Sequence, residues 1–121
     1  MEILASAMTE RERLRVELLK WMERTAVIIA PVGSTQAFAH GIRRIDVNGQ
    51  MLSIFRAFSY CQTYNVFGLP SASVPAGRTP DGLPLGVQII GRPYEEDVVL
   101  AVAAIVEREL GGWQMPMLDK L

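Results

Sequence analysis

The sequence comprises 121 residues, of which 50% are hydrophobic and 21% are charged. This composition is typical of a globular chain rather than a disordered one, and the length fits one domain or a piece of a larger domain. Because the net charge is −1 and basic and acidic residues are intermixed, a phosphate-binding surface for nucleic acids is not expected.

The first predicted element is an amphipathic helix from Thr9 to about Arg24. Thr9 is a suitable N-cap, and Glu12 three residues later completes a capping box. The pattern predicts an ordinary helix packed on a core. Its apolar residues follow at helical spacing, and they are Leu14, Leu18, Trp21 and Met22.

A short strand and a second helix are predicted next. Ala26–Pro31 is apolar without alternation, which is typical of a strand covered on both faces. Val32–Gln50 is a polar segment longer than ordinary connections, so we expect it to be functional or to pack against another part of the protein. A helix is predicted from Met51 to about Phe67, with Gly68 in the left-handed position after its end.

A β-hairpin is predicted after this helix. Ser71–Gly77 and Leu85–Gly91 are its strands and Thr79–Gly82 is its turn, so the two strands are antiparallel. Because a helix connects Ala26–Pro31 to Ser71–Gly77, these two strands are expected to run parallel with a right-handed crossover. The sheet is therefore predicted to be mixed.

The last predicted helix begins with the acidic run Glu95–Asp97 and ends at Gly111 and Gly112. Its centre, Val98–Val106, is apolar on every face and should be buried all round, and its nine residues are too few for a membrane span of about 20. The predicted elements cannot surround this helix and also cover both faces of strand Ala26–Pro31. We therefore expect apolar surface that another chain or domain covers.

Two features bear on the cellular compartment. The opening residues, MEILASAM, lack the basic region and long apolar core of a signal peptide. Cys61 is the one cysteine and cannot form an internal disulfide, which fits a reducing compartment. A soluble cytoplasmic protein that does not bind membranes is expected.

The stretch from Asn65 to Pro93 reads NVFGLPSASVPAGRTPDGLPLGVQIIGRP, and it resembles the C-terminal hairpin of the amidase-signature enzymes. A looser resemblance extends from Thr9 to Gly112. It implies an α/β fold in which residues 1–121 are a single segment from the C-terminal portion of the amidase-signature fold. The segment is the edge of a mixed β-sheet, in the order helix–strand–helix–β-hairpin–helix, covered by helices. The residues that carry the resemblance are Asn65, Gly68, Leu69, Pro70, Ser73, Pro75, Gly77, Asp81, Gly82, Leu83, Pro84, Gly86, Gln88 and Ile90–Pro93.

Several of these residues also have scaffold roles. Asp81 and Gly82 suit the turn, and Gly86 and Gly91 permit close approach of backbone. Gln88 is an amide among apolar neighbours and needs buried hydrogen-bond partners.

Amidase-signature enzymes hydrolyse carboxamides through an acyl-serine intermediate with a Ser–Ser–Lys triad, which the family carries upstream of this hairpin. The only lysines here are Lys20, on the exposed side of the first helix, and Lys120 near the end, and neither is expected to be buried as a base. Ser71 and Ser73 alternate on a strand and are interpreted as scaffold residues. No catalytic residue, metal ligand or cofactor is therefore expected in this chain, which is predicted to be inactive alone.

A second nucleophile would pair Cys61 with His40, with Asp46 as the orienting group. Triads assemble in space, so sequence distance does not forbid this set. However, Cys61 lies on the predicted core stripe, and buried cysteines are usually inert. His40 adjoins Gly41 in a loop and is interpreted as a solvated residue. One histidine and one cysteine also lack the spacing of a metal site.

The resemblance points to Phe58 as a substrate-binding residue. In the family, the helix before the Asn-x-x-Gly-Leu-Pro element helps to wall the acyl pocket. In the family members that act as glutamine-using amidotransferases, an Asp seven residues before that Asn binds the substrate's amino group, and this position is Phe58 here. A hydrophobic or aromatic amide would suit such a wall. The alternative is that Phe58 and Phe55 simply fill the core.

Two functions are therefore considered. The first is the C-terminal portion of an amidase that hydrolyses linear, small-molecule carboxamides, with the triad on a missing N-terminal portion and Met1 an internal methionine or the start of a truncated relic. The second is a non-catalytic α/β module that dimerises or binds a partner through its uncovered apolar faces.

Overall fold

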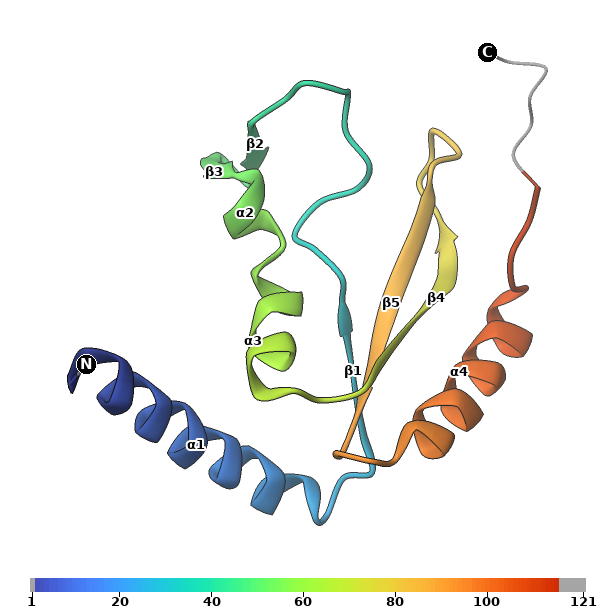
Figure 1. Ribbon diagram of the computed structural model, residues 1–121. Coiled ribbons are helices and arrows are strands. Elements are labelled where there is room, and N and C mark those ends of the chain that lie inside the picture. The colour runs from blue at the N-terminus through green and yellow to red at the C-terminus, as the bar shows by residue number, and fades with distance from the viewer. Residues whose placement is uncertain (1, 116–121) are drawn as a thin grey trace.

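The computed structural model describes residues 2–115 (Figure 1). It contains four helices and five strands in this part of the chain. In chain order they are α1 (Glu2–Met22), β1 (Val27–Pro31), β2 (Arg44–Val47), β3 (Gln50–Ser53), α2 (Ile54–Ala57), α3 (Ser59–Phe67), β4 (Ser71–Arg78), β5 (Pro84–Gly91) and α4 (Glu96–Leu110).

The larger sheet has three strands in the order β1-β5-β4. Both strand pairs are antiparallel, with Ile29 of β1 opposite Ile89 of β5 and Ser73 of β4 opposite Gln88 of β5. β1 and β4 therefore point the same way, as expected, but β5 lies between them. The α/β fold class is confirmed, whereas the expected mixed pairing is corrected: within the described residues each hydrogen-bonded pair is antiparallel, because β5 folds back between the two parallel strands.

Helices cover both faces of this sheet. α4 packs on one face, and α1 and α3 lie on the other (Figure 1). Side chains of β5 alternate between the two layers, so that Ile89 belongs to the cluster under α4 and Ile90 to the cluster under α1. The amide of Gln88, only 5% exposed, donates through Nε2 to the carbonyl oxygen of Pro31 at 2.8 Å, which satisfies the expected need for a partner.

The end of β5 lies very close to α4. A Cβ atom at Gly91 would collide with a methyl group of Val99, so the missing side chain allows this approach. Gly91→Ala is expected to lower the free energy of unfolding by about 1–3 kcal/mol, because α4 must move away from the sheet. Urea denaturation measures the loss. Gly86→Ala is the comparison variant: its Cβ would meet Val74 O at 3.3 Å, a milder contact than the one at Gly91, so its loss should be smaller. An equal loss in both variants would contradict the explanation.

The first helix begins earlier than expected. α1 already starts at Glu2, so Thr9 lies inside the helix and its Oγ1 donates to the carbonyl oxygen of Ala5 at 3.0 Å. The predicted capping box at Thr9 is therefore wrong. Residues 2–8 form additional helix because they contain neither glycine nor proline. The N-terminal end of α1 lies far from the sheet in Figure 1.

The predicted loop Val32–Gln50 contains part of a second sheet. Asn48 and Gly49 both have positive φ, 52° and 81°, and form the tight turn between β2 and β3. The expected helix from Met51 consequently begins only at Ile54, where the side chain of Ser53 accepts a hydrogen bond from Arg56 N.

Phe58 separates α2 from α3. Its φ of −102° and ψ of 21° interrupt the helical conformation between Ala57 and Ser59. The end of α3 agrees with the sequence, because Gly68 adopts the left-handed conformation with φ of 64°.

Apolar surface remains uncovered within the described residues. On α4, Val99 and Ala103 are buried against the sheet, whereas Leu100 and Ile105 on other faces are 62% and 49% exposed. On β1, Ile29 is 54% exposed although it points to the same side of the sheet as buried Ile89. The described elements thus cover only part of a helix and a strand that are apolar on more than one face.

Candidate functional site

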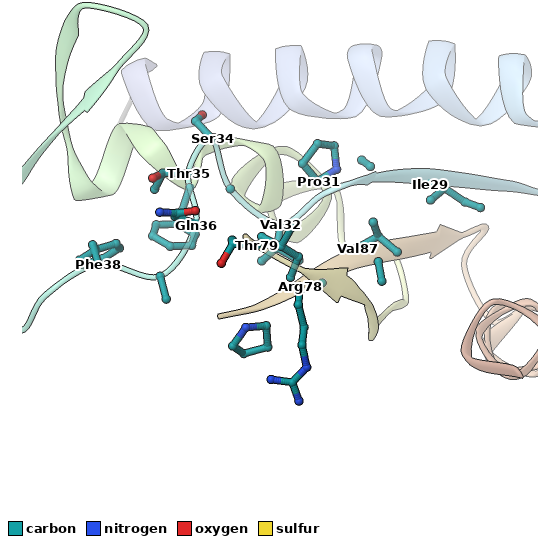
Figure 2. Close-up of a pocket in the computed structure, with 18 of the residues that line it drawn as sticks. Ile29, Pro31, Val32, Ser34, Thr35, Gln36, Phe38, Arg78, Thr79 and Val87 are labelled. Carbon is teal, nitrogen blue, oxygen red and sulfur yellow. The ribbon is translucent and has the colours of Figure 1, made fainter. Parts of the chain in front are cut away.

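An open hollow of about 910 Å³ lies at the end of β1. Its walls are the end of β1, the loop of residues 32–38 that follows it, Phe58, and the hairpin of β4 and β5 near its turn. Figure 2 shows Ile29 and Pro31 along β1, Val87 on β5, and the loop that carries Ser34 to Phe38.

The lining of the hollow combines an apolar base with a polar loop. Ile29, Pro31 and Val87 come from neighbouring positions of β1 and β5. The polar side chains of Ser34, Thr35 and Gln36 belong to the loop (Figure 2). This arrangement suits a ligand with an apolar body and a polar end.

Two hydrogen bonds hold this loop against the helices. Ser34 N donates to the carbonyl oxygen of Ala57 at 2.7 Å, and Cys61 Sγ donates to the carbonyl oxygen of Val32 at 2.8 Å. The first bond joins the loop to the last residue of α2, next to the break between α2 and α3. The loop is therefore fixed beside Phe58.

Two phenylalanines, Phe38 and Phe58, line the hollow beside this loop. The ring centroids of Phe38 and Phe58 are 6.3 Å apart, with the ring planes tilted by 56°. A Cβ atom on Gly33 would lie 2.9 Å from Phe58 Cε1, so the ring of Phe58 lies against the glycine. Phe58 is among the residues that line the hollow, and its role in substrate binding stays a prediction. Phe55 is 73% exposed and does not fill the core.

The structure does not assemble Cys61, His40 and Asp46 into a catalytic triad. The thiol of Cys61 faces the Val32 carbonyl, and Asp46 Oδ1 accepts from Gly49 N at 2.6 Å in the β2–β3 turn. His40 is exposed in the long loop. No hydrogen bond joins these three side chains in residues 2–115.

The serines and lysines are likewise not brought together. Ser71 and Ser73 lie on β4 with exposed positions, and Lys20 is exposed on α1. Lys120 lies outside the described residues. Among residues 2–115 no group of three or more His, Cys, Asp or Glu side chains is placed to hold a metal ion. The described helices include none with the length and apolar character needed to cross a membrane.

Sequence reasoning missed Phe38 and Gly33. The unusual length of the segment after β1 indicated that it had a role, but one phenylalanine and one glycine in a loop carry no periodic signal. Their relation to Phe58 depends on how the loop folds back over α2.

Comparisons with known proteins give the family. A family model described as Amidase matches residues 1–100. The chain belongs to the amidase family. A glutamyl-tRNA(Gln) amidotransferase subunit of Mesorhizobium japonicum is 40% identical over 88 residues, which are 73% of this chain and 16% of that protein. The corresponding protein of Thermoanaerobacter pseudethanolicus is 38% identical over 102 residues, which are 84% of this chain and 20% of that protein.

Solved amidase structures share the fold of this amidase chain. One crystal structure of an amidase superposes with a TM-score of 0.80 at 28% identity, covering 88% of this chain and 25% of that one. The 6-aminohexanoate cyclic dimer hydrolase has a TM-score of 0.72 at 29% identity, covering 95% and 26% of the two chains. The chain thus spans 16–20% of the length of these curated relatives and about a quarter of these solved structures. It has the fold of a fragment of an amidase-signature enzyme.

Proposed function

We propose that this chain supplies the C-terminal portion of a cytoplasmic amidase that hydrolyses linear carboxamides, and that the Ser–Ser–Lys triad belongs to the remaining portion. The observation that carries the proposal is the hollow beside Phe58, which lies in a chain about a quarter as long as the amidases that share its fold. The exposed Ile29 at the base of the hollow supports a further portion that packs against this part of β1.

The proposed reaction divides between the two portions. The serine oxygen attacks the amide carbon, the amine leaves with a proton, and water then releases the acid from the acyl-serine. The present chain contributes the sheet that supports the pocket and the wall at Phe58, while the oxyanion donors and the base come with the triad.

The wall favours amides with an apolar acyl group. Phe58 stands where the sequence resemblance places an Asp in the glutamine-using amidotransferases, and an aromatic ring offers no charge to a substrate's amino group. The similar proteins include glutamyl-tRNA(Gln) amidotransferase subunits. For this chain we nevertheless propose a small, apolar carboxamide as the substrate.

The test is complementation. The chain is produced together with an N-terminal amidase portion that carries the triad, and release of amine from a simple aryl amide is measured. Hydrolysis by the purified pair, absent from each part alone, is the expected result. Co-purification of the two parts without any hydrolysis would contradict the proposal. Within the pair, Phe58→Asp should lower kcat/KM for apolar amides at least about 10-fold, because it places a charge in an apolar wall.

A non-catalytic module is the second candidate. The observation that favours it is the exposed apolar surface of α4 at Leu100 and Ile105, together with Ile29 on β1. Analytical ultracentrifugation of the chain alone separates the two functions: a stable dimer with no affinity for the triad-bearing portion favours the module, and aggregation relieved by that portion favours the amidase.

A further inference from the structure

The glycine beside Phe58 has a spatial role rather than a conformational one. Gly33 does not have a φ in the left-handed region, so its backbone does not require glycine. Its missing side chain instead leaves room for the ring of Phe58, since an added Cβ would lie 2.9 and 3.0 Å from two ring carbons and 3.3 Å from Ala57 O. The missing side chain of Gly33 therefore allows the ring of Phe58 to lie against the loop backbone.

Phe38 completes a corner with two aromatic walls. Its ring is 6.3 Å from that of Phe58 at a tilt of 56°, which is the range of favourable aromatic pairs. Phe38 remains 38% exposed, and Ile29 on the base of the hollow remains 54% exposed. The corner thus presents aromatic and aliphatic surface that its own residues do not cover.

The charge beside the hollow selects against a cationic ligand. Among the described residues that line it, Arg78 is the only charged one, and its Nη1 donates to the carbonyl oxygen of Gly82 at 2.9 Å within the hairpin turn. The remaining polar lining comes from neutral side chains such as Ser34, Thr35 and Gln36. A neutral amide group therefore matches this lining better than an ammonium group.

We infer that the corner formed by Gly33, Phe38 and Phe58 binds the flat ring of a neutral aromatic carboxamide, and that Gly33 and Phe38 are specificity-determining residues. The role of this corner in catalysis rests on the proposed function, but binding of the ring can be measured with this chain alone. A ring packs on Phe58 in an edge-to-face or offset geometry, which a puckered aliphatic ring of the same size does not match.

The experiment compares benzamide with cyclohexanecarboxamide, which have the same number of heavy atoms and no charge. Their binding to the 121-residue chain is followed by NMR shifts of the phenylalanine ring signals. Benzamide is expected to bind about 2- to 12-fold more tightly, the range that aromatic packing supplies. Equal affinities, or no binding of benzamide at millimolar concentration, would overturn the inference.

Three variants and one matched control locate the effect. Phe58→Leu and Phe38→Leu should each reduce the preference for benzamide, and Gly33→Ala should reduce it by displacing the ring of Phe58. Phe38 lies on the loop and is partly exposed, so its variant remains informative if Phe58→Leu does not fold. The control is Phe55→Leu, at a phenylalanine that is 73% exposed on α2 and does not line the hollow, and it should keep the full preference.

Hydrolysis by the complemented enzyme separates this inference from the proposed function. Turnover of both amides without preference for benzamide would contradict the aromatic corner and leave the amidase function standing. A ring preference in binding, lost in Phe58→Leu but accompanied by no hydrolysis from the complemented pair, would contradict only the proposed function.

Discussion

The purified 121-residue chain is expected to hydrolyse amides no faster than buffer does. Loss of a serine-based triad costs about 10⁶-fold in kcat in a well-studied hydrolase, and the residual rate depends on an intact oxyanion site. Here Ser71, Ser73 and Lys20 are exposed, and no hydrogen bond joins them within residues 2–115. Amine release from a simple aryl amide, measured at high protein concentration over hours, checks the expectation.

The control is the variant in which both Ser71 and Ser73 are changed to alanine. These serines occupy exposed positions on β4, so the variant should fold as the parent does, which circular dichroism verifies. Turnover by the parent that disappears in this variant would show that the serines act as nucleophiles. Turnover that disappears only in Cys61→Ala would assign the reaction to the thiol, against its place facing Val32.

The hairpin of β4 and β5 could be predicted from the sequence because its signals are local. The turn residues Thr79–Gly82 and the left-handed Gly68 each have one satisfactory structural explanation, and both agree with the structure. Gly82 N donates to Thr79 O at 2.9 Å, which closes the predicted turn. Local chemistry of this kind is independent of the rest of the fold.

The errors arose where two local signals competed. Thr9 with Glu12 matched a helix start, but the residues before Thr9 also favour helix, and the longer helix formed. Asn48-Gly49 is a strong hairpin signal, but the polar character of Val32–Gln50 favours a loop, and the hairpin formed. The apolar spacing from Met51 then suggested a helix in residues that pair as β3 instead.

The candidate site could be predicted only in part for a different reason. The family resemblance singles out Phe58 by its position relative to Asn65, and the structure places this residue in the lining of the hollow. Gly33 and Phe38 meet Phe58 only because the loop after β1 returns to α2, where Ser34 N binds Ala57 O. The sequence does not predict this contact, because the contact depends on the path of a loop rather than on a periodic pattern.

Ile89→Ala and Ile29→Ala are expected to differ sharply in the chain alone. The two residues face each other in adjacent strands and point to the same side, yet Ile89 is fully buried and Ile29 is 54% exposed. Truncation of Ile89 leaves a cavity under α4 and should lower the free energy of unfolding by about 2–5 kcal/mol, whereas truncation of Ile29 should cost about 1 kcal/mol or less. Urea denaturation of both variants measures the contrast, and equal losses would contradict the described packing.

The Ile29→Ala variant also tests which part of the protein covers β1 in the assembled amidase. If the triad-bearing portion packs over the hollow, Ile29 becomes buried, and Ile29→Ala should then weaken assembly by about 5-fold or more, since removing a buried branched side chain costs over 1 kcal/mol. Titration of labelled chain with that portion measures the affinity. An unchanged affinity would contradict burial of Ile29 by that portion. The exposed face of β1 would then be free for another contact, such as the dimer of the non-catalytic module.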